Sequence, residues 1–172
     1  KKIMITLGGS DHNNLMFKLL DAIALLNQKF NIVIISSLGT GYVKRLKDYV
    51  INSNNQIKVK LDIPNLFCEF ENCDFAITAG GNSLFERIAS KTIGLTICQL
   101  ERQMQIANKF EEIDLNYNLG FGPTLSVEQI KIKLNIFINN FSVYKNQNKF
   151  SSKFVDGNGL KKKSKIINKL NY

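Results

Sequence analysis

Two pairs of adjacent glycines could bind phosphate through the protein backbone. The pairs are Gly8-Gly9 and Gly80-Gly81, and each lies between a short β-rich run and a helical period. A strand that ends at such a turn and continues as a helix directs unpaired N–H groups beyond the strand's end, where they attract anions. Either pair alone also fits a tight turn that favours glycine for steric reasons. Together the two turns predict one anion-binding crevice built from both.

Polar side chains follow each glycine pair and could add donors to this crevice. Ser10 follows the first pair, and Asn82 and Ser83 follow the second. Their hydroxyl and amide groups could bind a diphosphate beside the positive end of a helix dipole. Helix capping explains the same residues equally well. Both interpretations stay open at this point.

Glu86 and Gln103 are the further candidates for contacts with a nucleotide. Glu86 stands beside an apolar helical stripe, five residues after Gly81, where its carboxylate could accept from both hydroxyls of a ribose. The alternative is a solvated acid paired with Arg87 or Lys91. Gln103 lies in the loop after the next predicted strand and could reach the sugar or base, although such a residue often lies on the surface. We therefore expect a nucleoside diphosphate at this edge.

Other catalytic and cofactor motifs are missing from the sequence. His12 is the only histidine, and it could be a general acid or base, a phosphate contact or an ordinary loop residue. No P-loop, complete GxGxxG, Ser/His/Asp set or cluster of metal ligands occurs, so we expect no metal and no cofactor. The cysteines are Cys68, Cys73 and Cys98, an odd number without a CxxC pair, which favours a reducing cytoplasmic location.

The net charge of +9 comes from the last quarter of the chain. Residues 1–130 carry 13 basic and 13 acidic residues, whereas residues 131–172 carry 10 lysines and one acid, Asp156. The run Lys161–Lys165 has no interleaved aromatic residue on which a nucleic-acid base could stack. A solvated helix face is the favoured interpretation, and attraction of anionic ligands is the alternative.

The hydrophobic pattern predicts strands that alternate with helices. The strands are expected at 3–7, 32–36, 57–61, 74–78, 93–98 and 117–121. Helices are expected through Leu15–Leu26 after a cap at Ser10 or Asp11, at 40–52, in a short segment opened by Pro64, at 82–91 and 103–113, at 130–138 after a Ser126–Gln129 capping box, and in a Lys-rich segment within 154–172.

This alternation predicts an α/β fold, a doubly wound, Rossmann-like parallel sheet of about six strands with helices on both faces. In such sheets ligands bind beyond the carboxyl ends of the strands, where both glycine turns lie. A length of 172 residues fits a single domain, residues 1–172. Because the chain enters a strand directly at Lys1-Lys2-Ile3, we expect it to be a piece of a longer, two-domain protein.

The motifs resemble the C-terminal half of the GT-B glycosyltransferases, and among them the bacterial UDP-N-acetylglucosamine transferase of peptidoglycan synthesis. Within that superfamily they are most similar to the UDP-sugar hydrolase of pseudaminic acid biosynthesis. The segments that carry this resemblance are Gly8–Asp11 with Asn14, Cys73–Glu86 and Asp156–Gly159. The transferases usually have Gly-Gly-Ser-Gln-Gly-Ala in the first loop. Here Asp11 and His12 follow Ser10 instead, which favours the hydrolase branch.

The resemblance implies a role for individual residues. The backbone at Ile63 would meet uracil, Glu86 would bind the ribose, and Gln103 the ribose or phosphate region. Ser10 and the Asn82-Ser83 turn would take the diphosphate. The catalytic histidine of the hydrolase belongs to an N-terminal domain, so the resemblance implies no catalytic residue in this chain. It also implies two partners, a UDP-sugar and that N-terminal domain.

We therefore expect the chain to be the UDP-sugar-binding domain of a nucleotide-sugar hydrolase of surface-polysaccharide biosynthesis. The reaction would release UDP from the anomeric carbon of the sugar, and this chain alone would be inactive. One alternative is a GT-B glycosyltransferase that passes the sugar to a lipid or glycan acceptor, with the basic C-terminus in peripheral contact with an anionic membrane. An alternative of another class is a module that binds nucleic acid through its Lys-rich C-terminus.

Overall fold

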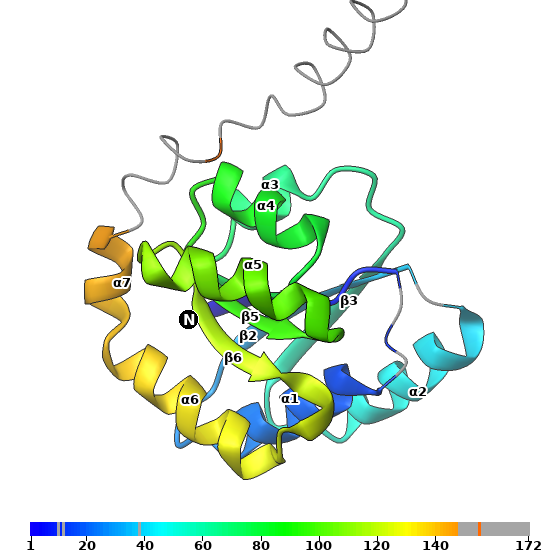
Figure 1. Cartoon of the computed structure of the whole chain (residues 1–172). Coiled ribbons are helices and arrows are strands. Elements are labelled where there is room, and N and C mark those ends of the chain that lie inside the picture. The colour runs from blue at the N-terminus through cyan, green and yellow to red at the C-terminus, as the bar shows by residue number, and fades with distance from the viewer. Residues whose placement is uncertain (10, 12, 38, 148–154, 156–172) are drawn as a thin grey trace, which may run out of the picture.

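All six expected strands form one parallel sheet. The computed structural model describes residues 1–9, 11, 13–37, 39–147 and 155 (Figure 1). Its strands pair in the order β3-β2-β1-β4-β5-β6. They are β1 (Lys2–Thr6), β2 (Asn31–Ser36), β3 (Gln56–Leu61), β4 (Phe75–Ala79), β5 (Gly94–Cys98) and β6 (Tyr117–Phe121). Each lies within one residue of its expected bounds. Four of the strands are short apolar runs, whereas β3 alternates apolar residues with lysines and β6 includes Asn118 and Gly120.

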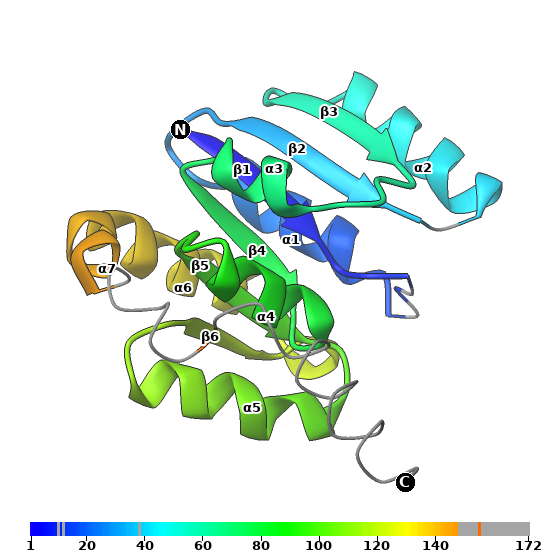
Figure 2. The ribbon, with the colours of Figure 1, turned by 90° about the horizontal axis from the view of Figure 1, so that it is seen from above.

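Helices cover both faces of the sheet, which confirms the doubly wound fold (Figures 1 and 2). Successive side chains of β1 point to opposite faces of the sheet, because Ile3 and Ile5 belong to one core cluster and Met4 belongs to another. The helices on the first face are α1 (Leu15–Ala24), α2 (Thr40–Ile51) and α6 (Val127–Asn139). Those on the second are α3 (Phe67–Glu71), α4 (Asn82–Ala89) and α5 (Glu101–Glu112).

Two short helices differ from the expectation. α3 begins at Phe67, so Pro64 lies before the helix and does not open it; the Asn65 side chain accepts from the Phe67 N–H instead. α7 (Phe141–Gln147) and a 3-10 turn (Gly122–Thr124) have no counterpart in the prediction. Tyr144 of α7 stacks on Phe137 of α6 at 4.9 Å between ring centroids, a tertiary contact that local polarity does not reveal. The Lys-rich segment of 154–172 lies outside the described residues apart from Val155.

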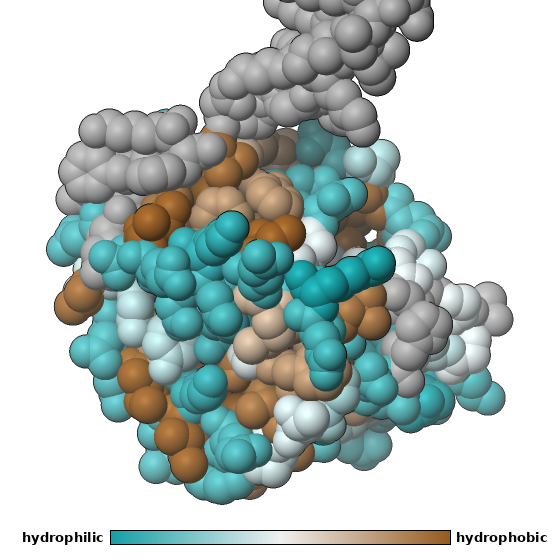
Figure 3. Space-filling model, in the orientation of Figure 1, coloured by the Kyte–Doolittle hydropathy of each residue, from teal (hydrophilic) through white to brown (hydrophobic). Residues whose placement is uncertain are grey.

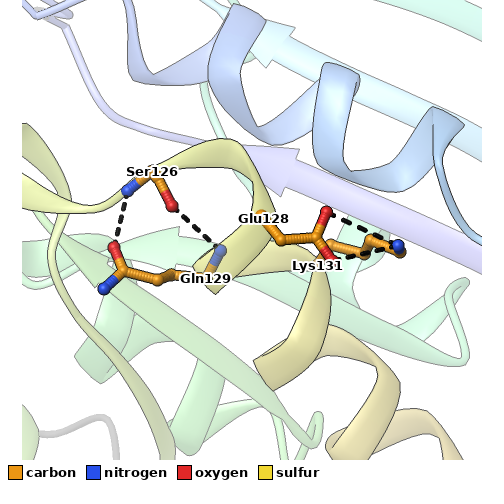
Figure 4. Close-up of polar contacts among 4 residues, drawn as sticks. All are labelled: Ser126, Glu128, Gln129 and Lys131. Carbon is orange, nitrogen blue, oxygen red and sulfur yellow. Dashed lines mark hydrogen bonds and ion pairs between the residues drawn. The ribbon is translucent and has the colours of Figure 1, made fainter.

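The capping box at the start of α6 is confirmed (Figure 4). The Ser126 hydroxyl accepts from the Gln129 N–H at 3.1 Å, and the Gln129 side chain accepts from the Ser126 N–H at 2.8 Å. One turn along, Lys131 pairs with Glu128 at 3.1 Å. Because the cap residue precedes the first helical residue, α6 begins at Val127, three residues before the expected start.

Part of the molecule's apolar surface lies over α6 and α7. Ile132, Ile136 and Val143 are exposed, and brown residues follow α6 on the face that Figure 3 shows. None of these three side chains lines the hollows described below. Among the described residues, no helix is both long enough and apolar enough to cross a bilayer.

Gly94 at the start of β5 is required by the close approach of β4. A Cβ atom at this position would lie 2.0 Å from the carbonyl oxygen of Ala76. We expect Gly94→Ala to lower the free energy of unfolding by about 3 kcal/mol, because the strand backbone would have to move apart. Urea unfolding followed by circular dichroism measures this.

The matched control is Gly41→Ala in α2, where a Cβ meets nothing within 4 Å. Alanine there should stabilise the helix by up to about 1 kcal/mol. Similar free energies of unfolding for the two variants would contradict the claim that the close approach of β4 requires glycine at position 94.

Candidate functional site

The two glycine turns meet at the carboxyl edge of the sheet. β1 pairs with β4, with Thr6 opposite Thr78, so both strands end at the same place. The turns line one hollow of about 640 Å³, which we call the glycine pocket. Six of the residues around it are Gly8, Gly9, Gly81, Asn82, Ser83 and Gln103. The single crevice predicted from the sequence is therefore present, while Ser10 and His12 lie outside the described residues.

A second hollow continues the glycine pocket along the same edge. It has a volume of about 580 Å³ and is lined by Ile63, with Phe67 and Leu66 as apolar neighbours, so we call it the Ile63 pocket. Five residues line both hollows: Thr6, Gly8, Gly9, Leu66 and Glu86. The two hollows thus form one cleft, which brings Ile63 and both glycine turns to the same edge of the sheet.

The N-terminus of α4 presents uncapped backbone N–H groups beside the glycine pocket. Gly81 is the N-cap residue, and no side chain of the described residues caps this end. Asn82 and Ser83 occupy the first helical turn and line the pocket. The Ser83 hydroxyl lies 3.5 Å from the carbonyl oxygen of Ala79 and points back toward the strand. The capping alternative is therefore not observed for these two residues, and the first N–H groups remain available to an anion.

Gln103 lies across from this helix end with its amide held in one orientation. Its side-chain oxygen accepts from the backbone N–H groups of Gln99 at 2.8 Å and Leu100 at 3.3 Å. Since these two contacts require the oxygen, the NH2 group faces the second glycine turn, 3.7 Å from where a Cβ on Gly81 would lie. A Cβ on Gly80 would lie 2.7 Å from that of Gln103, so Gly80 packs beneath Gln103 and lines neither hollow.

Glu86 stands where the two hollows join. Its side chain is exposed and forms no hydrogen bond or ion pair within the described part of the chain. The alternative pairing with Arg87 does not occur, because the guanidinium of Arg87 is fully buried and bound elsewhere. The Glu86 carboxylate is thus free to accept hydrogen bonds from a ligand that spans the cleft.

Arg87 anchors α4 to the sheet, a role that its neighbours in sequence do not indicate. Its guanidinium donates to the carbonyl of Thr92 at 3.2 Å and to the side-chain oxygen of Asn116 at 2.7 Å. Thr96 donates to the same oxygen of Asn116. Burial lowers the pKa of Arg87 to about 9, and no carboxylate of the described residues pairs with it. This network fixes the helix on which Glu86 stands.

Asp11 shapes the chain after the first glycine turn. Its carboxylate accepts from the N–H groups of Leu15 and Met16 at 2.7 and 3.0 Å and from the Tyr42 hydroxyl at 2.6 Å. Burial and the contact with Asp11 raise the pKa of Tyr42. Asp11 therefore caps α1, as one of the two expected residues, although the residue directly before the helix is Asn14.

Gln99 joins the two sides of the glycine pocket. Its side-chain NH2 donates to the carbonyl of Leu7 at 2.6 Å, and the side chain is buried. This bond links the end of β5 with the start of the first glycine turn, 92 residues earlier. The sequence shows only that Gln99 follows a strand, since its partner is set by the strand order.

The chain is similar to a curated protein and to several solved structures. It is 25% identical over 173 residues to the spore coat polysaccharide biosynthesis protein SpsG of Bacillus subtilis strain 168, covering 99% of this chain and 50% of SpsG. MurG of Acinetobacter baumannii matches with a TM-score of 0.76 and 15% identity, over 98% of this chain and 52% of MurG. Alr3699/HepE of Anabaena, in complex with UDP and glucose, matches with a TM-score of 0.71 and 14% identity, over 99% and 48%. No family model matches the chain.

These similarities establish the fold. The six-stranded parallel sheet with its flanking helices matches the C-terminal domain of GT-B glycosyltransferases, which confirms the fold expected from the sequence. The chain spans about half the length of the curated relative that it matches. Because one fold supports many activities, the function has to be argued from the cleft itself.

The bonds of Asp11 lead to a stability prediction. We expect Asp11→Asn to lower the free energy of unfolding by about 2 kcal/mol, because the amide NH2 would face the Met16 N–H and leave a buried donor unpaired. The chain has no tryptophan, so circular dichroism in urea is the suitable measurement.

The control is Asp21→Asn, which changes the same chemistry in the exposed pair of Asp21 with Tyr49, 2.7 Å apart. It should change the free energy of unfolding by less than about 1 kcal/mol. Equal losses in the two variants would contradict a structural role of Asp11 at the turn.

Proposed function

We propose that the chain is the UDP-sugar-binding half of a GT-B enzyme of polysaccharide biosynthesis, with UDP as the group that leaves the anomeric carbon. The observation that carries the proposal is one cleft lined by both glycine turns, by the uncapped end of α4 and by Glu86. The names of two similar proteins agree with it, since SpsG is a polysaccharide biosynthesis protein and HepE was solved with UDP and glucose.

In this proposal the diphosphate lies in the glycine pocket. Small turns at Gly8, Gly9 and Gly81 let its oxygens approach backbone N–H groups closely. The end of α4 and the NH2 group of Gln103 add donors that are already oriented before the ligand binds. Charge builds on the diphosphate as the bond to the sugar breaks, and oriented donors stabilise that charge more than the ground state.

The nucleoside would lie in the Ile63 pocket. Leu66 and Phe67 provide apolar surface for a base, and the backbone at Ile63 would bind its polar edge. Glu86, at the junction of the hollows, would accept from the ribose hydroxyls between base and diphosphate. Ile63 lines only the Ile63 pocket and Gly81 only the glycine pocket, whereas Glu86 lines both. A ribose at Glu86 would therefore lie between a base at Ile63 and a diphosphate at the second glycine turn.

We favour transfer of the sugar to a lipid or glycan acceptor over hydrolysis. The similar solved structures include glycosyltransferases, among them the spinosyn rhamnosyltransferase SpnG. Asp11, which favoured the hydrolase in the sequence, has a local role that explains its presence, since it caps α1 and binds Tyr42. Hydrolysis remains the second candidate because Cys73–Glu86 resembles the hydrolase. In either case a second domain would close the cleft and bind the other substrate.

Glu86→Ala tests the nucleotide site. We expect the variant to bind UDP about 10- to 100-fold more weakly than the unchanged chain, because it loses hydrogen bonds between a carboxylate and two hydroxyls. Isothermal calorimetry with UDP measures the dissociation constants. Glu112→Ala removes an exposed acid at the far end of α5 and should bind UDP like the unchanged chain. Equal affinities of all three proteins would remove Glu86 from the site.

A turnover assay separates transfer from hydrolysis. The proposed transferase should release UDP from UDP-N-acetylglucosamine or UDP-glucose only when an acceptor is present, because the second domain would exclude water from the reacting carbon. The assay uses the full-length protein and measures UDP with and without a crude lipid or glycan acceptor fraction. Rapid release of UDP and free sugar without any acceptor would favour the hydrolase and overturn our preference.

A further inference from the structure

We infer that Arg102 binds the diphosphate of the ligand, as a residue that the sequence motifs do not single out. Arg102 is the second residue of α5 and lines the glycine pocket together with both glycine turns. The inference rests on the proposed function, because it assigns a contact to the same cleft. It adds a positive charge to a site that otherwise relies on N–H groups and one amide.

The charges around the glycine pocket support this assignment. Among the described residues that line it, Arg102 is the only cation and Glu86 is the only acid. The Arg102 side chain is exposed and forms no hydrogen bond or ion pair within the described part of the chain. Its guanidinium is therefore not neutralised by a described protein partner. By contrast, the other arginine near α4, Arg87, is fully buried and bound to Asn116.

The position of Arg102 along the cleft favours phosphate over the nucleoside as its partner. Arg102 lines only the glycine pocket, whereas Glu86 lines both hollows. Its neighbour Gln103 is fixed by bonds to Gln99 and Leu100, so the first turn of α5 has a defined place beside the second glycine turn. A guanidinium can donate two parallel hydrogen bonds to a phosphate, and it keeps its charge at neutral pH.

The test compares Arg102→Gln with Lys109→Gln, which removes an exposed charge from the last turn of the same helix. The probes are inorganic pyrophosphate, UDP and uridine, and calorimetry on the chain gives their dissociation constants. We expect Arg102→Gln to bind pyrophosphate and UDP about tenfold more weakly and uridine unchanged. Lys109→Gln should stay within about twofold for all three probes. Added salt should weaken pyrophosphate binding less in Arg102→Gln than in the unchanged chain.

Each outcome separates this inference from the proposed function. If the unchanged chain binds UDP, and Arg102→Gln binds pyrophosphate and UDP as tightly as the unchanged chain does, the inference is wrong and the proposed function stands. If pyrophosphate binding depends on Arg102 but neither UDP nor uridine binds better than pyrophosphate, the inference stands and the nucleotide assignment fails. A chain that binds none of the probes overturns both. Equal weakening of all three probes in Arg102→Gln shows a general disturbance of the cleft and also overturns the inference.

Discussion

The parallel pairing of β1 with β4 is the constraint on which the cleft depends. The strand order reverses between these two strands, since the chain runs outward from β1 to β3 and then returns to β4 on the other side. α1 and α4 leave their strands over opposite faces of the sheet, as Figure 2 shows. The connections diverge there and open a crevice at the carboxyl edge. Both glycine turns line it because each follows one of the two central strands.

Polar side chains in the loops keep this crevice open by bonding to backbone groups that would otherwise be unpaired. Gln99 binds the carbonyl of Leu7, Gln103 binds two N–H groups of its own loop, and Asp11 caps α1. Buried polar groups are stable only with such partners. The same bonds fix where donors face: the oxygen of Gln103 is engaged by the loop, so its NH2 group is turned toward the second glycine turn. The candidate site is thus held in place by contacts that are structural in themselves.

α4 separates two neighbouring charged residues into different roles. Successive residues of a helix point about 100° apart, so Glu86 faces the cleft while Arg87 points into the protein. The guanidinium has no carboxylate partner in the part of the chain that the structure describes, and its burial lowers its pKa. Its bonds to Thr92 and Asn116 hold the helix against the segments that lead into β5 and β6. A fixed helix presents Glu86 at a constant place between the two hollows, which suits recognition of a ribose.

The sequence alone determined the fold class, because the apolar runs and turn residues that define six strands are local signals. It also indicated the glycine turns and the capping box at Ser126, whose partners lie within a few residues. It did not reveal α7, which depends on the ring of Phe137, or the later start of α3. Only the tertiary structure decided which loop residues share a pocket. Strand order brings Gln99 to Leu7 across 92 residues and Arg102 to the glycine turns, and no local pattern encodes which strands become neighbours.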